Sequence, residues 1–416
     1  MRWFASVSGK SEKIAVLLSR AIDMAGGLVF LKLISTHASK ADMGTYMLAT
    51  SIVALLLTVS FSAISQGVLR NVSDYLTQGE LPQRYTAALI GYLITAPLYA
   101  WLALNLIKEL GISDVLSPYI FLIVIWVASD ALKTLNTSVA AAMRQRYLIA
   151  AASVLDYSIK LAAIGFCILE GRLNTTMIIL IMAFACATVG LFFIAIQKTF
   201  LTKTSFSIFT NTFKQATHFA WPMMIWGAFG WAQSMSGRWI VEKYLGAESV
   251  ASLGVITTIG SLPVNAIFGV VITYVQPIIY EIESKKIGSS KQYINNIIKI
   301  IAPILMAMLF VSCVYHYEII TIATSQKYGD VSGYLPVVVG SVILSSIGSA
   351  LSYVTLAKKR TSSLLIANTL PGFLSIVLGI LLIPKFGLSG AVTTVAVSHL
   401  LSFLLLVVNH QKQIKS

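Results

Sequence analysis

Charged side chains are scarce in this sequence. Asp, Glu, Lys and Arg make up 11% of its 416 residues, against about 25% in ordinary soluble domains. A soluble globule of this length needs far more polar surface, so the composition excludes a soluble enzyme, a disordered chain and a collagen-like fibre. Long continuous apolar runs also exclude an outer-membrane barrel, whose strands would alternate in polarity.

Cysteines and acidic residues are few as well. The three cysteines lie in apolar runs, and their number and spacing fit no metal site or disulfide framework, so we interpret them as packing residues. The formal charge is +14, but the basic residues form no stripe, which argues against a nucleic-acid partner. Nucleotide-binding, metalloprotease and nucleophile-elbow motifs are lacking. The sequence therefore predicts no enzyme, cofactor or metal site, and any driving energy must come from a gradient, the membrane potential or substrate supply.

Apolar residues, by contrast, make up 57% of the chain. A helix that crosses a bilayer needs about 20 of them, so the composition allows about a dozen crossings. The hydrophobic runs predict an all-α integral membrane protein with twelve transmembrane helices. The predicted helices cover residues 13–35, 43–68, 85–107, 117–142, 147–169, 174–197, 217–240, 250–276, 293–315, 333–356, 362–384 and 387–409.

The distribution of basic residues predicts the orientation. An even number of crossings places both termini on one side, and that side holds 18 Lys and Arg residues in its loops and tails. The opposite side holds six. Positive charge accumulates in cytoplasmic loops, so both termini are expected in the cytoplasm, and this bias accounts for the net charge.

The two halves of the chain repeat at a fixed spacing. Arg144 follows the fourth predicted helix and Lys358 the tenth, 214 residues apart, and Lys198 and Lys412 follow the sixth and twelfth at the same spacing. This pattern predicts two pseudo-symmetric six-helix lobes, residues 1–215 and 216–416, that enter the membrane from the same side. The alternative is that all helices followed by a basic loop look alike.

Six ionisable residues fall deep inside predicted helices of the first half, where a charge is costly unless it faces a partner or a cavity. They form pairs at helical spacing: Arg20 with Asp23, Asp130 with Lys133, and Asp156 with Lys160. Trp126 shares the face of the second pair. One interpretation is three local ion pairs that hold helices together; the other is a hydrated lumen whose cations bind an anionic headgroup.

Two residues of the second half are weaker candidates. Arg238 ends the seventh predicted helix, where it either takes part in function or simply extends its charge to the outer interface. His399 lies in the middle of the twelfth helix and is either a hydrogen-bonded packing residue or a proton site.

Local motifs resemble those of a known family. Asp42-Met43-Gly44-Thr45-Tyr46 is similar to an acidic-aromatic-Gly-x-Tyr motif at the start of the second helix, with Met43 in place of the aromatic residue. That helix ends in Gly67-Val68-Leu69-Arg70, like the family's Gly-x-x-Arg. Gly237-Arg238-Trp239 stands where the family often shows Asp-Arg-Tyr, without the acidic member. With two six-helix lobes and short loops, the chain resembles the polysaccharide (O-antigen, Wzx-type) flippases of the multidrug/oligosaccharidyl-lipid/polysaccharide exporter superfamily.

This resemblance implies a MATE-like, V-shaped fold that moves a polyprenyl-diphosphate-linked oligosaccharide by alternating access. The cargo would be an O-antigen or capsule repeat unit, carried from the cytoplasmic to the periplasmic leaflet of a bacterial inner membrane. The implied partners are this lipid-linked glycan, membrane lipid, H⁺ or Na⁺ as coupling ion, and other glycan-assembly membrane proteins. The residues implied for ion coupling are Asp23, then Asp156 and Asp130; those for substrate binding are Arg20, Lys133, Lys160, Arg238 and Trp126.

Two other functions stay open from the sequence. A multidrug or metabolite exporter on the same fold should have an acidic or aromatic cavity, and the three internal cations argue mildly against it. A membrane glycan polymerase or ligase needs catalytic residues on a sizeable outer loop. The largest predicted outer loop, residues 316–332, has His316, Glu318, Lys327 and Asp330 scattered over it, which is little for catalysis.

Overall fold

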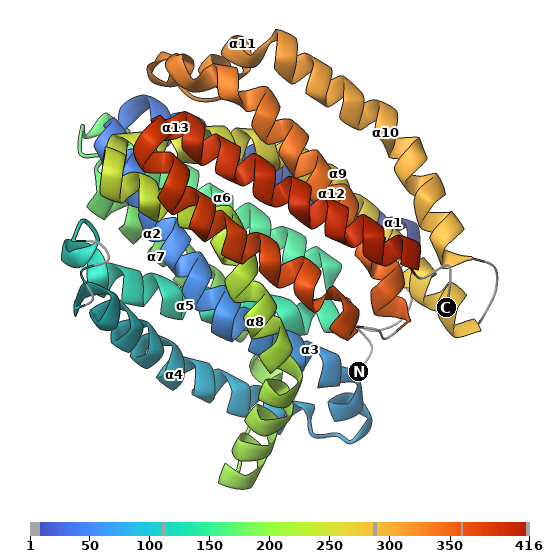
Figure 1. Cartoon of the computed structure of the whole chain (residues 1–416). Helices are drawn as coiled ribbons and strands as arrows, with labels where there is room; N and C mark the ends of the chain where they lie inside the picture. The colour runs from blue at the N-terminus through green and yellow to red at the C-terminus, as the bar shows by residue number, and fades with distance from the viewer. Residues whose placement is uncertain (1–8, 110, 112–113, 286–288, 359–360, 413–416) are drawn as a thin grey trace. The chain divides into compact units, whose positions relative to one another are not determined.

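The helices of the computed structural model follow the predicted spans. The structure describes residues 9–109, 111, 114–285, 289–358 and 361–412, and no strand occurs among them (Figure 1). The α-helices are α1 (Gly9–His37), α2 (Lys40–Leu56), α3 (Ser62–Thr77), α4 (Leu81–Glu109), α5 (Ile120–Ala142), α6 (Arg146–Leu169), α7 (Thr175–Ile196), α8 (Phe206–Leu245), α9 (Ala247–Lys285), α10 (Ser290–Val314), α11 (His316–Ala323), α12 (Leu335–Ala357) and α13 (Leu365–Lys412). Short 3₁₀ segments lie at Ser117–Tyr119, Lys198–Phe200, Gln326–Tyr334 and Thr361–Leu364, and a π-helical turn lies at Leu57–Phe61.

Helix α13 contains the last two predicted spans. Its backbone leaves the helical region at Gly387, where φ is 60° and ψ is −136°. A residue with a side chain is strained in this left-handed conformation, whereas glycine adopts it readily. Gly387 therefore ends the first of the two spans, and the second begins directly after it.

Nine helical segments among the described residues are long and apolar enough to cross a membrane, and one of them is the segment Leu365–Gln411 of α13. Helices α1 and α8 are not among the nine. Both carry polar and charged residues within their predicted spans, such as Arg20 and Asp23 in α1. The chain is thus a multi-pass membrane protein, and α1 and α8 contain the first predicted span of each predicted lobe.

The chain forms two compact units. The first consists of residues 1–38 and 48–227, and the second of residues 39–47 and 228–416. Helices α2 and α8 each supply residues to both. The lobe boundary predicted between residues 215 and 216 falls within α8 and stays a prediction.

In the first unit, α5 packs against α4 and α7, and α1 packs against α6. Hydrogen bonds between buried polar side chains connect the helices. The Tyr85 hydroxyl of α4 donates to Asn136 Oδ1 of α5 at 2.5 Å. The Tyr92 hydroxyl donates to the Phe61 carbonyl oxygen at 2.8 Å and lies 2.9 Å from Ser65 Oγ of α3. These bonds satisfy polar groups that would be costly if left alone in an apolar interior.

In the second unit, α12 packs against α9, α10 and α13, and Figure 1 shows it alongside α13. Helix α12 has 23 residues and follows a 3₁₀ segment directly, and so does α5 of the first unit. The two units therefore repeat this element, at a spacing of 215 residues between the helix starts.

Candidate functional site

A charged cluster in the first unit is centred on Asp156 of α6. Its Oδ2 accepts a hydrogen bond from Lys160 Nζ at 2.8 Å and another from Lys133 Nζ at 2.9 Å. Lys160 lies four residues further along the same helix, which places it on the same face as Asp156. Lys133 comes from α5. Two ammonium groups thus share one carboxylate oxygen and connect α5 to α6.

The members of this lysine–aspartate cluster differ in exposure. The side chains of Asp156 and Lys160 are 8% and 7% exposed, whereas that of Lys133 is 25% exposed. Each ammonium has three N–H donors, so both lysines retain donors beyond those given to Asp156. Lys133 is thus the most exposed of the three residues.

The second oxygen of Asp156 is buried, and no group in the described part of the chain donates to it. A buried carboxylate oxygen without a donor is costly. The attraction of the two ammonium groups for one carboxylate offsets that cost, so Asp156 holds Lys133 and Lys160 together inside the unit.

Asp130 lies one turn before Lys133 on α5, half-buried and within electrostatic range of both lysines. The expected local pair of Asp130 with Lys133 does not form, since among the described residues no cation lies within 4.0 Å of its carboxylate. Lys133 instead extends to Asp156, which also binds Lys160. The cluster therefore contains two cations and two carboxylates, with the positive charge concentrated around Asp156.

Asp23 of α1 lies at the edge of this cluster. Its carboxylate is within electrostatic range of the Tyr157 hydroxyl on α6. The Tyr157 ring lies 5.1 Å from Lys160 Nζ, an arrangement in which the ring face attracts the cation. Gly26 lets α1 approach, because a Cβ there would overlap the Tyr157 ring. The packing of α1 on α6 thus places Asp23 close to Tyr157, whose ring lies over Lys160.

The other residues predicted in the first half lie apart from these hydrogen bonds. Arg20 is exposed on α1, and no ion pair joins it to Asp23 within the described ranges. Trp126 is 3% exposed on α5, one turn before Asp130. Their predicted roles in substrate binding stay predictions.

Sequence reasoning missed two members of the cluster's surroundings. Tyr157 gave no signal, although it directly follows Asp156. Cys186 of α7 was interpreted as a packing residue, and its buried thiol lies within electrostatic range of Lys133 and Asp130. Contacts between α5, α6 and α7 bring these side chains together. The spacing of residues within one helix does not show which residues of other helices they contact.

Arg238 belongs to the second unit. Its side chain is 7% exposed, and its guanidinium donates to the Met47 carbonyl oxygen at 3.2 Å. The structure therefore buries Arg238, whereas the sequence allowed a snorkelling side chain. Arg238 lies beside a polar cavity of about 460 Å³ that α8, α9, α12 and α13 enclose.

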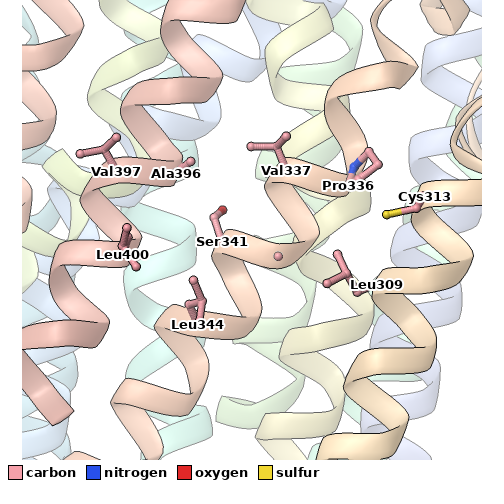
Figure 2. A pocket seen from close by; sticks show the side chains of 10 residues that line it. Leu309, Cys313, Pro336, Val337, Ser341, Leu344, Ala396, Val397 and Leu400 are labelled. Carbon is pink, nitrogen blue, oxygen red and sulfur yellow. The ribbon is translucent and has the colours of Figure 1, made fainter.

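A second hollow of the same unit is an apolar groove of about 450 Å³ along α12, between α10 and α13. Figure 2 shows the side chains that line it, with Ser341 as the one hydroxyl among the labelled residues. Ser341 Oγ lies 3.2 Å from His399 Nδ1, and His399 also lines the polar cavity. This hydrogen bond connects α12 to α13 between the groove and the cavity.

Comparison with known proteins identifies the fold. No family model matches the sequence, and no curated protein matches it. The structure is similar to a multidrug resistance MATE family transporter of the MOP superfamily in an inward-facing conformation, at a TM-score of 0.74 and 12% identity over 96% of this chain and 94% of that one. It is similar to the lipid II flippase MurJ at 0.68 and 16% identity over 98% and 88%. It is also similar to the Vibrio cholerae MATE transporter VcmN at 0.66 and 16% over 97% and 96%.

These likenesses confirm the predicted fold class, an all-α, MATE-like membrane fold with twelve transmembrane helices in two six-helix lobes. The similar structures are transporters and a flippase of one superfamily. At such low identity the fold alone is shared, and multidrug transporters and a lipid flippase both have it. The cargo must therefore be argued from this chain's own side chains.

Proposed function

We propose that this protein is a flippase that moves a polyprenyl-diphosphate-linked oligosaccharide, an O-antigen or capsule repeat unit, across a bacterial inner membrane. The observation that carries the proposal is the lysine–aspartate cluster, in which two ammonium groups share the Asp156 carboxylate and Lys133 is partly open. A diphosphate supplies the oxygen acceptors that the remaining Lys N–H donors require. Transport proceeds by alternating access from the cytoplasmic to the periplasmic leaflet, with both termini in the cytoplasm.

Coupling to H⁺ or Na⁺ is part of this proposal. Asp23, Asp156 and Asp130 are the proposed coupling carboxylates. Asp156 binds Lys133, so an anionic headgroup that binds Lys133 competes with Asp156 for this cation. Binding of the headgroup therefore favours a proton or sodium ion on a released carboxylate. The membrane potential is an alternative energy source, because moving a charge across it is worth about 2.3 kcal/mol per 100 mV.

The proposal is tested in a strain that lacks the gene. Lipid-linked repeat units should accumulate on the cytoplasmic leaflet while their synthesis continues, and surface glycan should be lost. Complementation with Lys133→Ala should restore less than a tenth of the wild-type surface glycan. A tenfold loss of transport corresponds to a free-energy change of about 1.4 kcal/mol. Lys133→Arg, which keeps the charge, should restore more. Lys299→Ala, which removes an exposed cation on α10, is the matched control. Normal surface glycan in the deletion strain would falsify the proposal.

A multidrug or metabolite exporter is the second candidate, because multidrug transporters have this fold. It predicts that the deletion strain becomes sensitive to cationic drugs while its surface glycan is unchanged. The cluster argues against this function, since a cationic drug would meet two lysines at the partly open side of Asp156.

A further inference from the structure

The polar cavity of the second unit has a composition unlike that of the lysine–aspartate cluster. Half of its fourteen lining residues carry hydroxyls, and the others supply one amide, one imidazole, one guanidinium, one thioether and three valines; none of them is a carboxylate or a Phe, Tyr or Trp. The lining residues that carry the argument are Arg238, Thr257, Ser261, Ser345, Ser346 and His399. Its volume of about 460 Å³ lies within the range of about 300–1,000 Å³ usual for small-ligand sites.

Many of these hydroxyls are arranged as acceptors. Thr257 donates its proton to the Leu253 carbonyl oxygen at 2.8 Å, and Ser261 donates to the Thr258 carbonyl oxygen at 3.2 Å. A hydroxyl that donates to its own helix keeps its lone pairs for another donor. Ser345 and Ser346 differ, because within the described residues their hydroxyls have no hydrogen-bond partner. The cavity thus offers a ligand both hydrogen-bond acceptors, such as Thr257 and Ser261, and hydroxyls that can donate, Ser345 and Ser346.

This pattern selects among ligand classes. An anion supplies only acceptors and would leave the hydroxyl lone pairs unpaired. A cationic drug is usually bound by a carboxylate or by the face of a Phe, Tyr or Trp ring, and the lining has none of these. A ligand with many hydroxyls both donates and accepts at each position, and the carbon–hydrogen face of a sugar ring fits the apolar patch of Val338, Val342 and Val395.

We infer that this cavity binds a carbohydrate. The inference deepens the proposed function, since it places the sugar part of a lipid-linked glycan in the second unit. Arg238 is the lining residue that carries guanidinium N–H groups, and the hydrogen bond of His399 with Ser341 holds the imidazole in place. Neutral hydrogen-bonding groups, rather than charge, then determine which sugar is accepted.

The test measures how fast a hydrophilic thiol reagent labels a cysteine in the cavity. Ser345→Cys is placed in the full chain with the three natural cysteines replaced, and the protein is held in lipid nanodiscs. The probes are methyl glycosides of glucose, galactose and N-acetylglucosamine, compared with sulfate and choline. At least one neutral glycoside should slow labelling about threefold, as expected when its concentration is about twice its Kd. Sulfate and choline should leave the rate unchanged.

Leu344→Cys is the matched control, because Leu344 is the neighbouring residue on α12 and lines the apolar groove instead. Its labelling rate should not respond to the glycosides. Ser349→Cys, at another lining position, replaces Ser345→Cys if that variant fails to fold. The inference is wrong if no glycoside slows labelling, or if sulfate or choline protects as well as the sugars do. Because these probes carry no lipid, protection is independent of the export result, so the two proposals can fail separately.

Discussion

Helices α5 and α12 occupy corresponding positions in the two units, yet their polar residues differ in kind. With their first residues aligned, at the spacing of 215, Trp126 matches Ser341, Asp130 matches Ser345, and Lys133 matches Gly348. The two charged positions of α5 are thus occupied in α12 by a hydroxyl residue and a glycine. The comparison teaches that a repeated helix can keep its length while its charged positions are replaced by neutral ones.

If the two units differ in this way, the largest effect should come from removing the Asp156 carboxylate, which both lysines of the first unit share. Asp156→Asn leaves Lys133 and Lys160 without the carboxylate that they share. We expect a loss of about 3–5 kcal/mol in the free energy of unfolding, because the substitution leaves buried charge uncompensated. Thermal unfolding of the purified variant measures the loss.

The double variant Asp156→Asn with Lys160→Met is the control for that experiment. Removing the most buried cation together with the anion should restore most of the stability. A single Asp156→Asn variant as stable as the wild type would show that the cluster is hydrated and that its charges do not depend on one another.

Neutral hydrogen bonds of the first unit should matter less than its charges. Tyr85→Phe removes the hydroxyl that donates to Asn136 Oδ1 and leaves that buried amide oxygen without this donor. We expect a cost of about 1–3 kcal/mol, the penalty for an unsatisfied buried polar group. Unfolding of Tyr85→Phe, of Asn136→Leu and of the double variant measures whether the two effects are coupled.

Substitution of Lys133 should affect transport much more than stability. Lys133→Met leaves Asp156 paired with Lys160, and the lysine side chain is already 25% exposed. The free energy of unfolding should therefore fall by about 1 kcal/mol or less, while glycan export falls at least tenfold. Equal losses in the unfolding and export assays would mean that Lys133 only holds α5 against α6.

The smallest effect is expected in the second unit. Ser341→Ala removes the hydrogen bond to His399, and hydrogen bonds between membrane helices average about 0.6 kcal/mol. The same unfolding assay measures this change in stability, which can then be compared directly with the effect of Tyr85→Phe in the first unit. A loss as large as that of Asp156→Asn would instead reveal a charged network around His399.

The sequence predicted the helices well because each apolar run is long and nearly free of charge. Residues 173–197, for example, carry no charge at all, and α7 covers 175–196. The helix ends were less predictable: α8 begins at Phe206 rather than near residue 217, since a helix continues past the point where its hydropathy falls. The predicted loop at 316–332 contains α11. This helix has 8 residues, too few for a recognisable helical pattern of apolar side chains.

The candidate site was only partly predictable. The i, i+4 spacing identified Asp156 and Lys160 as neighbours on one face, and the structure pairs them at 2.8 Å. The partner of Lys133 was not predictable, because it depends on how α5 and α6 face each other. The polar cavity of the second unit was not predictable for a similar reason. Ser and Thr residues are common in helices, and only the packing of α8, α9 and α12 brings these particular hydroxyls together.

The π-helical turn at Leu57–Phe61 sets the rotational phase of the helices on either side of it. The Ser62 amide donates to the Leu57 carbonyl oxygen, five residues back, so this turn contains one residue more than an α-helical turn. Each residue of an α-helix corresponds to a rotation of about 100°. Deleting one residue here would turn α3 relative to α2 by about that angle and carry Ser65 away from Tyr92. The extra residue of the π-helical turn therefore determines the rotation of α3 about its axis relative to α2, and inserting or deleting a residue here would rotate one helix against the other.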